Sequence, residues 1–256
     1  MLKKRVIFTL LYDNQNFMLS RNFRLQKVGN IKWLNLNYKF SKISSSIDEL
    51  IILNVGRIKK DKESFLMHIR KLTENCFIPI AAGGGVNDIE YAKSLLRNGA
   101  DKVVVNTALF NNKNLIYSLS EEFGAQCIVA SVDLKFENNT FSLWVENGTS
   151  KVDILPEIFL KNISEMPIGE IYLNSMDKDG TGQGYMMDLL DLLPKKTSIP
   201  IIIAGGAGNY RHLAEGLDDK QIDAVATAHL FNFVGDGLIN ARKKLFDNNY
   251  NLAKWL

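Results

Sequence analysis

The sequence predicts a (β/α)8 barrel made of two similar half-barrels, and three observations lead to this fold class. Two stretches, 78–107 and 199–228, follow one plan: Ile-Pro with a short apolar run, a glycine cluster, a helix-like run, then an acidic residue before a second apolar run. Apolar runs alternate with helix-like segments along the chain, which is typical of parallel βαβ units. The 256 residues suit the roughly 250 that eight such units take.

The repeat has a regular spacing. Gly83 and Gly205 lie 122 positions apart, and so do Asp101 and Asp223. A repeat of about half the chain predicts one domain, 1–256, in which the two halves share a plan. An open doubly wound sheet is the other architecture to weigh, but eight evenly spaced units and the repeat argue against it.

The first half-barrel, about 1–122, contains four predicted strands and four predicted helices. Within the predicted strand 49–54, residues 50–53 are continuously apolar, as in a parallel sheet covered on both faces. The segment 62–75 is amphipathic with a helical period. The polar segment 12–30 is expected to be a loop or a short hairpin. The strands are expected at 5–11, 49–54, the start of the first repeat, and 102–106. The helices are expected at 31–44, 62–75, 88–97 and 111–123.

The second half-barrel, about 123–256, follows the same order. Segment 134–150 alternates polar and apolar residues between turn residues, which favours a hairpin inserted after a strand. The second repeat supplies a strand, a helix and a last strand. The other elements are strands at 126–133 and 170–174 and helices at 156–164 and about 238–246.

Composition excludes several function classes. The chain has 31 basic and 28 acidic residues, a balance that does not favour nucleic acid or an anionic membrane as a partner. No run approaches the roughly 18 apolar residues of a membrane span, and the apolar run after Arg5 is too short for a signal peptide. Cys76 and Cys127 suit free thiols in a reducing cytoplasm. The three histidines show no metal-ligand spacing, so we expect neither a metal nor a cofactor.

The glycine clusters predict two phosphate cradles. Glycines after a strand let backbone N–H groups approach an anion, and the following helix presents the positive end of its dipole. Two cradles suggest two phosphates, or one ligand with a phosphate at each end; alternatively, the glycines only close tight turns. The loop 177–181, Asp-Lys-Asp-Gly-Thr, follows a strand and suggests a ligand loop, although an ordinary Asp-Gly turn fits too.

Asp133 is the candidate for proton transfer. It ends a predicted strand on the side where barrel ligands bind, and a partly desolvated carboxylate there can act as a general acid or base. Alternatively, Asp133 caps the next element or pairs with Lys135. The position that matches Asp133 in the first half is Leu11, which can neither take nor give a proton.

Several segments resemble one family over nearly the whole chain. They are MLKKRVI, DELIILN, PIAAGGGVNDIEYAKSLLRNGADKVVVNTA, FGAQCIVASVD, GEIYLNSMDKDGTGQGY and PIIIAGGAGN. They resemble the cyclase subunit of imidazole glycerol phosphate synthase from histidine biosynthesis. The resemblance implies a (β/α)8 barrel that receives ammonia from a glutaminase docked at the barrel bottom. The ammonia then passes through the barrel to a substrate with two phosphates at the top.

The resemblance also assigns residues to roles. The implied phosphate-binding residues are Gly84, Gly85, Asn106, Thr107, Asp179, Gly180, Gly205, Gly206, Thr227 and Ala228. The implied ammonia gate is Arg5, Glu49, Lys102 and Glu170, which could instead be solvated charges or a plain ion ring where strands begin. Asp101 is the implied contact to the glutaminase, and Asp133 is one of two implied catalytic aspartates. The chain departs from the family at four positions, Leu11 for the other aspartate, Leu19 for a lysine, Asn54 for an aspartate and His229 for a serine.

This pattern resembles the branch of the family associated with glycosyl amidation in bacterial surface-polysaccharide synthesis. We therefore expect a heterodimer with a glutaminase subunit, a separate sugar amidotransferase and a phosphorylated small-molecule ligand. One alternative is a working cyclase (a lyase) of histidine biosynthesis that tolerates Leu11. Another is a non-catalytic barrel that only binds and activates its partner.

Overall fold

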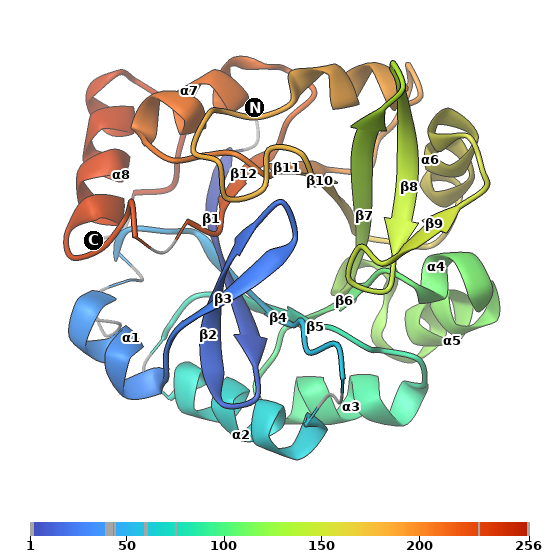
Figure 1. Ribbon diagram of the computed structural model, residues 1–256, viewed down its shortest axis with the longest axis horizontal. Coiled ribbons are helices and arrows are strands. Elements are labelled where there is room, and N and C mark those ends of the chain that lie inside the picture. Colours follow the sequence, from blue (N-terminus) through green and yellow to red (C-terminus); the bar gives the residue numbers. More distant parts are fainter. Residues whose placement is uncertain are drawn as a thin grey trace.

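A closed barrel of eight parallel strands forms the centre of the molecule, which confirms the predicted fold class (Figure 1). The computed structural model describes residues 3–38, 43, 45–58, 61–74, 76–229 and 231–254. Each strand pairs in parallel with the next, and the last strand pairs with the first. In order around the barrel the strands are β1 (Arg5–Asp13), β4 (Glu49–Asn54), β5 (Ile80–Gly83), β6 (Lys102–Val105), β7 (Ile128–Glu137), β10 (Glu170–Ser175), β11 (Ile201–Ala204) and β12 (Ala224–Thr227).

Helices surround the barrel (Figure 1). The α-helices are α1 (Ile31–Tyr38), α2 (Lys62–Thr73), α3 (Ile89–Arg97), α4 (Ala108–Asn111), α5 (Lys113–Phe123), α6 (Pro156–Ser164), α7 (Tyr210–Asp218) and α8 (Gly237–Asp247). The part of the chain that the structure describes also forms the short 3-10 helices η2 (Ala125–Cys127) and η3 (Met187–Leu192). Helices α3 and α7, which follow the two glycine clusters, begin alike: the side chains of Asp88 and Asn209 accept hydrogen bonds from first-turn N–H groups.

Two antiparallel hairpins extend from the barrel. Strand β1 continues into β2 (Asn16–Arg21) and β3 (Arg24–Gly29), so the predicted loop or short hairpin is a hairpin. Strand β7 continues to Glu137 and pairs with β8 (Thr140–Val145), which pairs with β9 (Ser150–Val152). Because both hairpins follow the carboxyl ends of barrel strands, both lie at the mouth of the barrel where a ligand site is expected.

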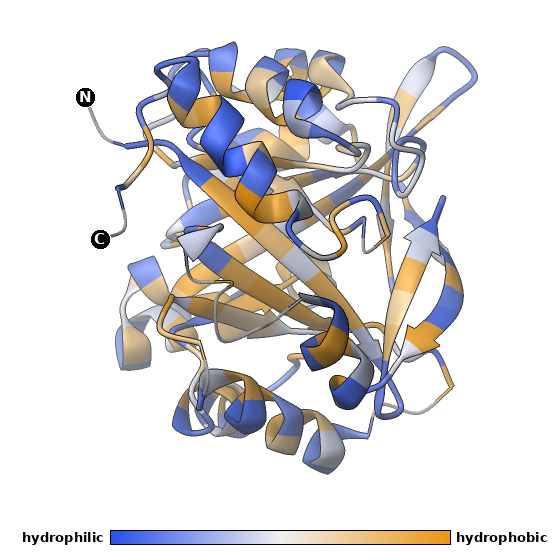
Figure 2. Ribbon diagram, turned by 90° about the vertical axis from the view of Figure 1, so that its left-hand side faces the viewer, coloured by the Kyte–Doolittle hydropathy of each residue, from blue (hydrophilic) through white to orange (hydrophobic). Residues whose placement is uncertain are grey.

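The core has two parts. The larger part lies between the outward strand faces and the apolar faces of the helices, and Figure 2 shows the central strands apolar and the helices polar on their outer surfaces. The smaller part fills the barrel interior with inward side chains such as Ile7, Val104, Tyr172 and Ile202. Among the described residues, no helix combines the length and the apolar character needed to cross a membrane.

Three predicted helices differ from the observed ones. The helix predicted at 31–44 ends at Tyr38, with 39–42 and 44 outside the described residues. The helix predicted at 62–75 ends at Thr73, and position 75 also lies outside them. The helix predicted at 111–123 begins two residues later, as α5 at Lys113, because the side chain of Asn112 accepts a hydrogen bond from the N–H of Leu115 and caps the helix; Asn111 instead ends the separate helix α4.

The predicted pairing of glycines is wrong by one position. Gly84 and Gly205, which are 121 positions apart, occupy matching sites: a Cβ on Gly84 would lie 2.2 Å from the carbonyl of Asn54, and one on Gly205 would lie 2.5 Å from that of Ser175. Gly83 instead ends strand β5, as Ala204 ends β11. The second half therefore carries one extra residue between its glycines and its last strand.

Side chains at the opposite end of the barrel join strands to their neighbours. The carboxylate of Asp101 accepts the N–H of Ile80 (2.8 Å), and that of Asp223 accepts the N–H of Ile201 (2.9 Å), so the repeat is also present in these contacts. Asp48 accepts the N–H of Val6 (2.7 Å) and both terminal nitrogens of Arg242 from α8 (2.7 and 2.8 Å). The last helix is thereby fixed to the beginning of the barrel.

Candidate functional site

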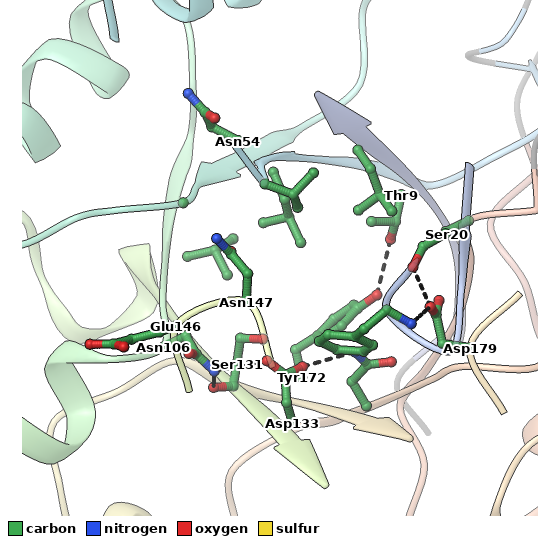
Figure 3. Close-up of a pocket in the computed structure, with 18 of the residues that line it drawn as sticks. Thr9, Ser20, Asn54, Asn106, Ser131, Asp133, Glu146, Asn147, Tyr172 and Asp179 are labelled. Atoms are coloured by element: carbon green, nitrogen blue, oxygen red, sulfur yellow. Dashed lines mark hydrogen bonds between the residues drawn. The ribbon is translucent and has the colours of Figure 1, made fainter. Parts of the chain in front are cut away.

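A pocket of about 820 Å³ opens at the carboxyl ends of the barrel strands. It is walled by strand ends, the turns that follow them and the β2–β3 hairpin (Figure 3). The structure brings together in this pocket every residue predicted to bind phosphate, the proton-transfer candidate Asp133, and Leu11, which matches Asp133 in the first half. They are Leu11, Gly84, Gly85, Asn106, Thr107, Asp133, Asp179, Gly180, Gly205, Gly206, Thr227 and Ala228. Their phosphate binding stays a prediction.

The two glycine turns need glycine for a steric reason. Gly84 (φ 101°), Gly85 (φ 80°), Gly205 (φ 87°) and Gly206 (φ 111°) all have positive φ, which L side chains rarely adopt. The turns also pass so close to the preceding strand that no Cβ fits beside the carbonyl of Asn54 or Ser175. Each turn therefore brings bare backbone to the pocket wall, just before helix α3 or α7. This arrangement suits an anion.

Asp133 lies at the mouth end of β7 with a buried carboxylate. Oδ1 accepts a 2.9 Å hydrogen bond from the amide of Asn174, and Oδ2 accepts one of 3.2 Å from the amide of Asn106 (Figure 3). Burial raises the pKa of Asp133 to about 7, and the charge of Asp179 adds to this, while the two amide donors oppose it. A carboxyl group with this pKa can take or give a proton near neutral pH.

Leu11 lies on β1 and also lines the pocket. Its strand neighbour Leu53 on β4 lines the same wall, so the two leucines form an apolar patch there, although Thr9 and Asn54 of the same strands also line the pocket. The β7–β10 side carries Asp133 and Asn174 and is polar. The two sides of the pocket therefore differ at the strand ends: Leu11 and Leu53 line it from β1 and β4, and Asp133 and Asn174 line it from β7 and β10.

Asp179 connects the loop after β10 to the β2–β3 hairpin. Its Oδ2 accepts hydrogen bonds from the hydroxyl of Ser20 and, at 3.0 Å, from the N–H of Phe23, and its carbonyl accepts the N–H of Asn22 (2.9 Å). Burial raises its pKa, and the bonds from Ser20 and Phe23 oppose this. The structure thus places the carboxylate against the hairpin. Of the two residues predicted here, Gly180 has no side chain, so it presents only backbone to the pocket.

Three further polar residues border the cradles. The hydroxyl of Thr227 donates to the carbonyl of Ala207 (2.9 Å) and accepts the N–H of His229 (3.3 Å). The hydroxyl of Thr107 contacts Oδ1 of Asn106 (3.4 Å) and accepts the N–H of Glu146 (3.3 Å). His229 lines the pocket, and burial lowers its pKa, so its neutral form is favoured there.

The four residues predicted as an ammonia gate form a closed ring at the opposite end of the barrel. Arg5 pairs with Glu49 (2.8 Å) and Glu170 (2.6 Å), and Lys102 pairs with Glu49 (3.0 Å) and Glu170 (2.9 Å). The Glu49 side chain is only 2% exposed. Burial raises its pKa, and the neighbouring Lys102 opposes this. Each charge has two partners of opposite sign, so the ring is fully paired; its gating role stays a prediction.

Asp101 lies beside the ring at the start of β6, exposed to solvent apart from its bond to Ile80. Its predicted role as a partner contact stays untested. Among the residues that the structure describes, no group of three His, Cys, Asp or Glu side chains could hold a metal ion.

Sequence reasoning missed two residues of the site, Tyr172 and Ser20. Tyr172 lies on the inward face of β10, two positions after Glu170 and two before Asn174, and the two-residue period of a strand places all three on one face. Ser20 carried no such signal, because its partner Asp179 is 159 positions away.

The fold and the site together define a (β/α)8 barrel of two half-barrels with a ligand pocket at one end and a charged ring at the other. A family model described as "Histidine biosynthesis protein" matches residues 34–235. The chain belongs to this family.

Individual relatives agree with the family match. A protein of Parasynechococcus marenigrum that carries the provisional name imidazole glycerol phosphate synthase subunit hisF2 is 44% identical over 256 residues, covering 100% of this chain and 95% of the relative. Imidazole glycerol phosphate synthase subunit HisF of Chlorobaculum parvum is 33% identical over 248 residues, covering 96% and 97%. The subunit of that name from Chlorobium phaeovibrioides is 35% identical over 200 residues, covering 78% and 80%.

Proposed function

We propose that this chain is the ammonia-accepting barrel of a two-component glutamine amidotransferase. The observation that carries the proposal is the fully paired ring of Arg5, Glu49, Lys102 and Glu170 at the end of the barrel opposite the pocket. A glutaminase docked on that face, in contact with Asp101, would release ammonia at the ring. Movement of one charged side chain would admit the ammonia to the barrel interior, on the way to the pocket that holds Asp133.

The proposed acceptor is a phosphorylated small molecule held between the two cradles, and the proposed pathway is sugar amidation for surface polysaccharides. The difference between the two sides of the pocket supports sugar amidation over the histidine-pathway reaction. Acid and base work shared by two carboxylates needs a second group across from Asp133, and the facing wall carries Leu11 and Leu53. In this proposal a separate amidotransferase activates the sugar, and the barrel supplies ammonia.

The test of the partner is direct. We expect the protein to co-purify with the glutaminase encoded nearest to its gene and to raise the rate of glutamine hydrolysis. Asp101→Asn, which keeps an acceptor for the N–H of Ile80, should lower that stimulation without unfolding the barrel. If the pure proteins neither associate at micromolar concentration nor stimulate hydrolysis, the proposal fails.

A working cyclase of histidine biosynthesis is the second candidate, because Asp133 lies in the pocket with a pKa of about 7. A steady-state assay with the substrate of imidazole glycerol phosphate synthase and excess ammonium salt removes any dependence on a partner. We expect negligible turnover, and only a trace after Leu11→Asp. Wild-type turnover on the order of 1 s⁻¹ or more, a usual enzyme rate, would replace the sugar-amidation proposal with this one. Stimulation of the glutaminase without any ligand binding in the pocket would favour a purely activating barrel.

A further inference from the structure

The barrel axis between the ring and the pocket is crossed by one large side chain. Tyr172 points inward from β10, and its hydroxyl lies 3.2 Å from Oγ1 of Thr9 on β1 (Figure 3). Strands β11 and β12 lie between β10 and β1 in the barrel, so this hydrogen bond joins distant sides of the wall. Tyr172 is 6% exposed and forms part of the pocket floor.

The strand register shows why a tyrosine fits there. In a barrel of this type, alternate strands contribute four side chains to each interior layer. The layer that contains Thr9 is completed by Gly83, Ser131 and Ala204, all small, so space remains at the axis. The ring of Tyr172 extends upward from the layer below and fills that space.

Beneath Tyr172 the interior is apolar. The next layer toward the charged ring at the other end of the barrel consists of Ile7, Ala81, Val129 and Ile202, all fully buried. Below this layer lie the paired charges of Glu49, Lys102 and Glu170. A small molecule that crossed the charged ring would therefore meet a packed apolar layer that Tyr172 covers on the pocket side.

We propose that Tyr172 and Thr9 form a hydrogen-bonded bar that closes the barrel interior beneath the pocket, and that ammonia enters the pocket only when Tyr172 moves. This inference rests on the proposed function and adds a second closure in series with the ring. The pocket above provides the free volume into which the tyrosine ring swings. Ammonia can replace the lost hydrogen bond, because it both donates to and accepts from a hydroxyl.

Two closures in series have a functional consequence. With the ring alone, opening at the partner side would connect the glutaminase directly to the pocket and its solvent. With the bar in place, ammonia waits in the apolar layer of Ile7, Ala81, Val129 and Ile202 while the pocket stays sealed. The bar then makes delivery of ammonia depend on the state of the pocket, because Tyr172 can move only when there is room for it at the pocket floor.

The closure is tested with a thiol placed beneath the bar. Ala81→Cys puts a reporter in the apolar layer, Cys127→Ala removes the half-exposed thiol, and the buried Cys76, which lies outside the barrel interior, remains as an internal reference. The full chain is treated with methyl methanethiosulfonate, and the labelling rates of positions 81 and 76 are followed by peptide mass. The readout is the ratio of the two rates, because global unfolding raises both together.

With Tyr172 present, we expect the introduced thiol to be labelled about as slowly as Cys76. Tyr172→Ala should raise the ratio at least tenfold, and Tyr172→Phe, which keeps the ring but loses the bond to Thr9, should raise it a fewfold. Tyr185→Phe is the matched control: Tyr185 is a buried tyrosine whose hydroxyl donates to the carbonyl of Ala226, but it lies outside the barrel interior, so the ratio should not change.

A ratio unchanged by Tyr172→Ala would overturn the proposal, as would a high ratio while Tyr172 is present. The assay contains neither glutaminase nor ammonia. A negative result in this assay would therefore overturn the proposed bar and leave the proposed function untouched. The proposed function is tested separately by association with the glutaminase and by stimulation of glutamine hydrolysis.

Discussion

The side-chain amide of Asn174 donates a 2.9 Å hydrogen bond to Oδ1 of Asp133, its directly paired neighbour on β7. Asn106, which directly follows the other neighbouring strand β6, donates to the second oxygen. The carboxylate is thus held by two neutral amides and by no cation in the described part of the chain. The surrounding burial therefore determines its proton affinity.

Asp133 should titrate near pH 7 and make stability depend on pH. Its folded-state pKa of about 7 lies above an unfolded value of about 3.9, so the folded state binds more protons between these values. The free energy of unfolding should therefore fall as pH rises from about 4 to about 7, by on the order of 4 kcal/mol from this group. Carbon-13 NMR of the carboxyl group and urea denaturation at several pH values measure both effects.

Asp133→Asn should flatten this pH dependence, because no proton is then taken up at position 133. Glu90→Gln, which removes an exposed carboxylate on α3, is the matched control and should keep the wild-type profile. A carbon-13 titration of Asp133 near pH 4 would contradict the description of a desolvated carboxyl group.

Glu49→Gln should destabilise the protein by about 3–5 kcal/mol, as expected when one partner of a buried ion pair is removed. Arg5 and Lys102 would each lose one of two charged partners within the barrel. Urea denaturation measures the loss. Glu90→Gln, which breaks only the exposed contact to Lys93, should give no measurable change; an equally small effect at Glu49 would mean that the ring is solvated.

Gly84→Ala should cost more stability than Gly235→Ala. Both glycines have positive φ (101° and 67°), which for an L residue costs roughly 1–2 kcal/mol. Only at Gly84 would the new Cβ also meet a backbone carbonyl, that of Asn54, at 2.2 Å, whereas at Gly235 nothing lies within 4 Å. The difference between the two variants in thermal or urea unfolding isolates the close approach of the turn to β4. Equal losses would show that the turn relaxes freely.

Crystals soaked in phosphate should show two anions, one at Gly84–Gly85 and one at Gly205–Gly206. The physical reason is the same at both sites: bare backbone in a glycine turn followed by a helix start. Gly205→Ala should abolish the second anion and leave the first. Density at neither turn, with both open to solvent, would contradict the two-cradle interpretation.

Much of the fold was predictable because its signals are local. Each signal occupies only a few neighbouring positions. These signals are the glycines at turns that need positive φ, the apolar runs of the strands, and the Asp or Asn residues at helix starts. The one-residue error in pairing Gly83 with Gly205 arose because the first cluster has three glycines and the sequence alone does not say which two turn.

The unpredicted parts depend on which way a residue faces or on distant contacts. Strand β10 reads Glu-Ile-Tyr-Leu-Asn-Ser, and a strand buried on both faces hides which residues point inward. Tyr172 was therefore easily taken for an ordinary strand residue. The contact of Asp179 with Ser20 and that of Asp48 with Arg242 join positions 159 and 194 residues apart, and no local pattern predicts either.

The pairing of β1 with β12 means that the barrel can close only late in synthesis on the ribosome. Strand β1 leaves the ribosome first, yet its edge that faces β12 stays open until residues 224–227 have been made. Arg5 and Lys102 likewise wait for Glu170, their shared partner from the later half. While residues 102–169 are being made, the nascent chain therefore carries an unpaired edge on β1 together with two basic ring residues and one acidic one at the end where β1 begins. These features make that end the one that a chaperone would need to shield.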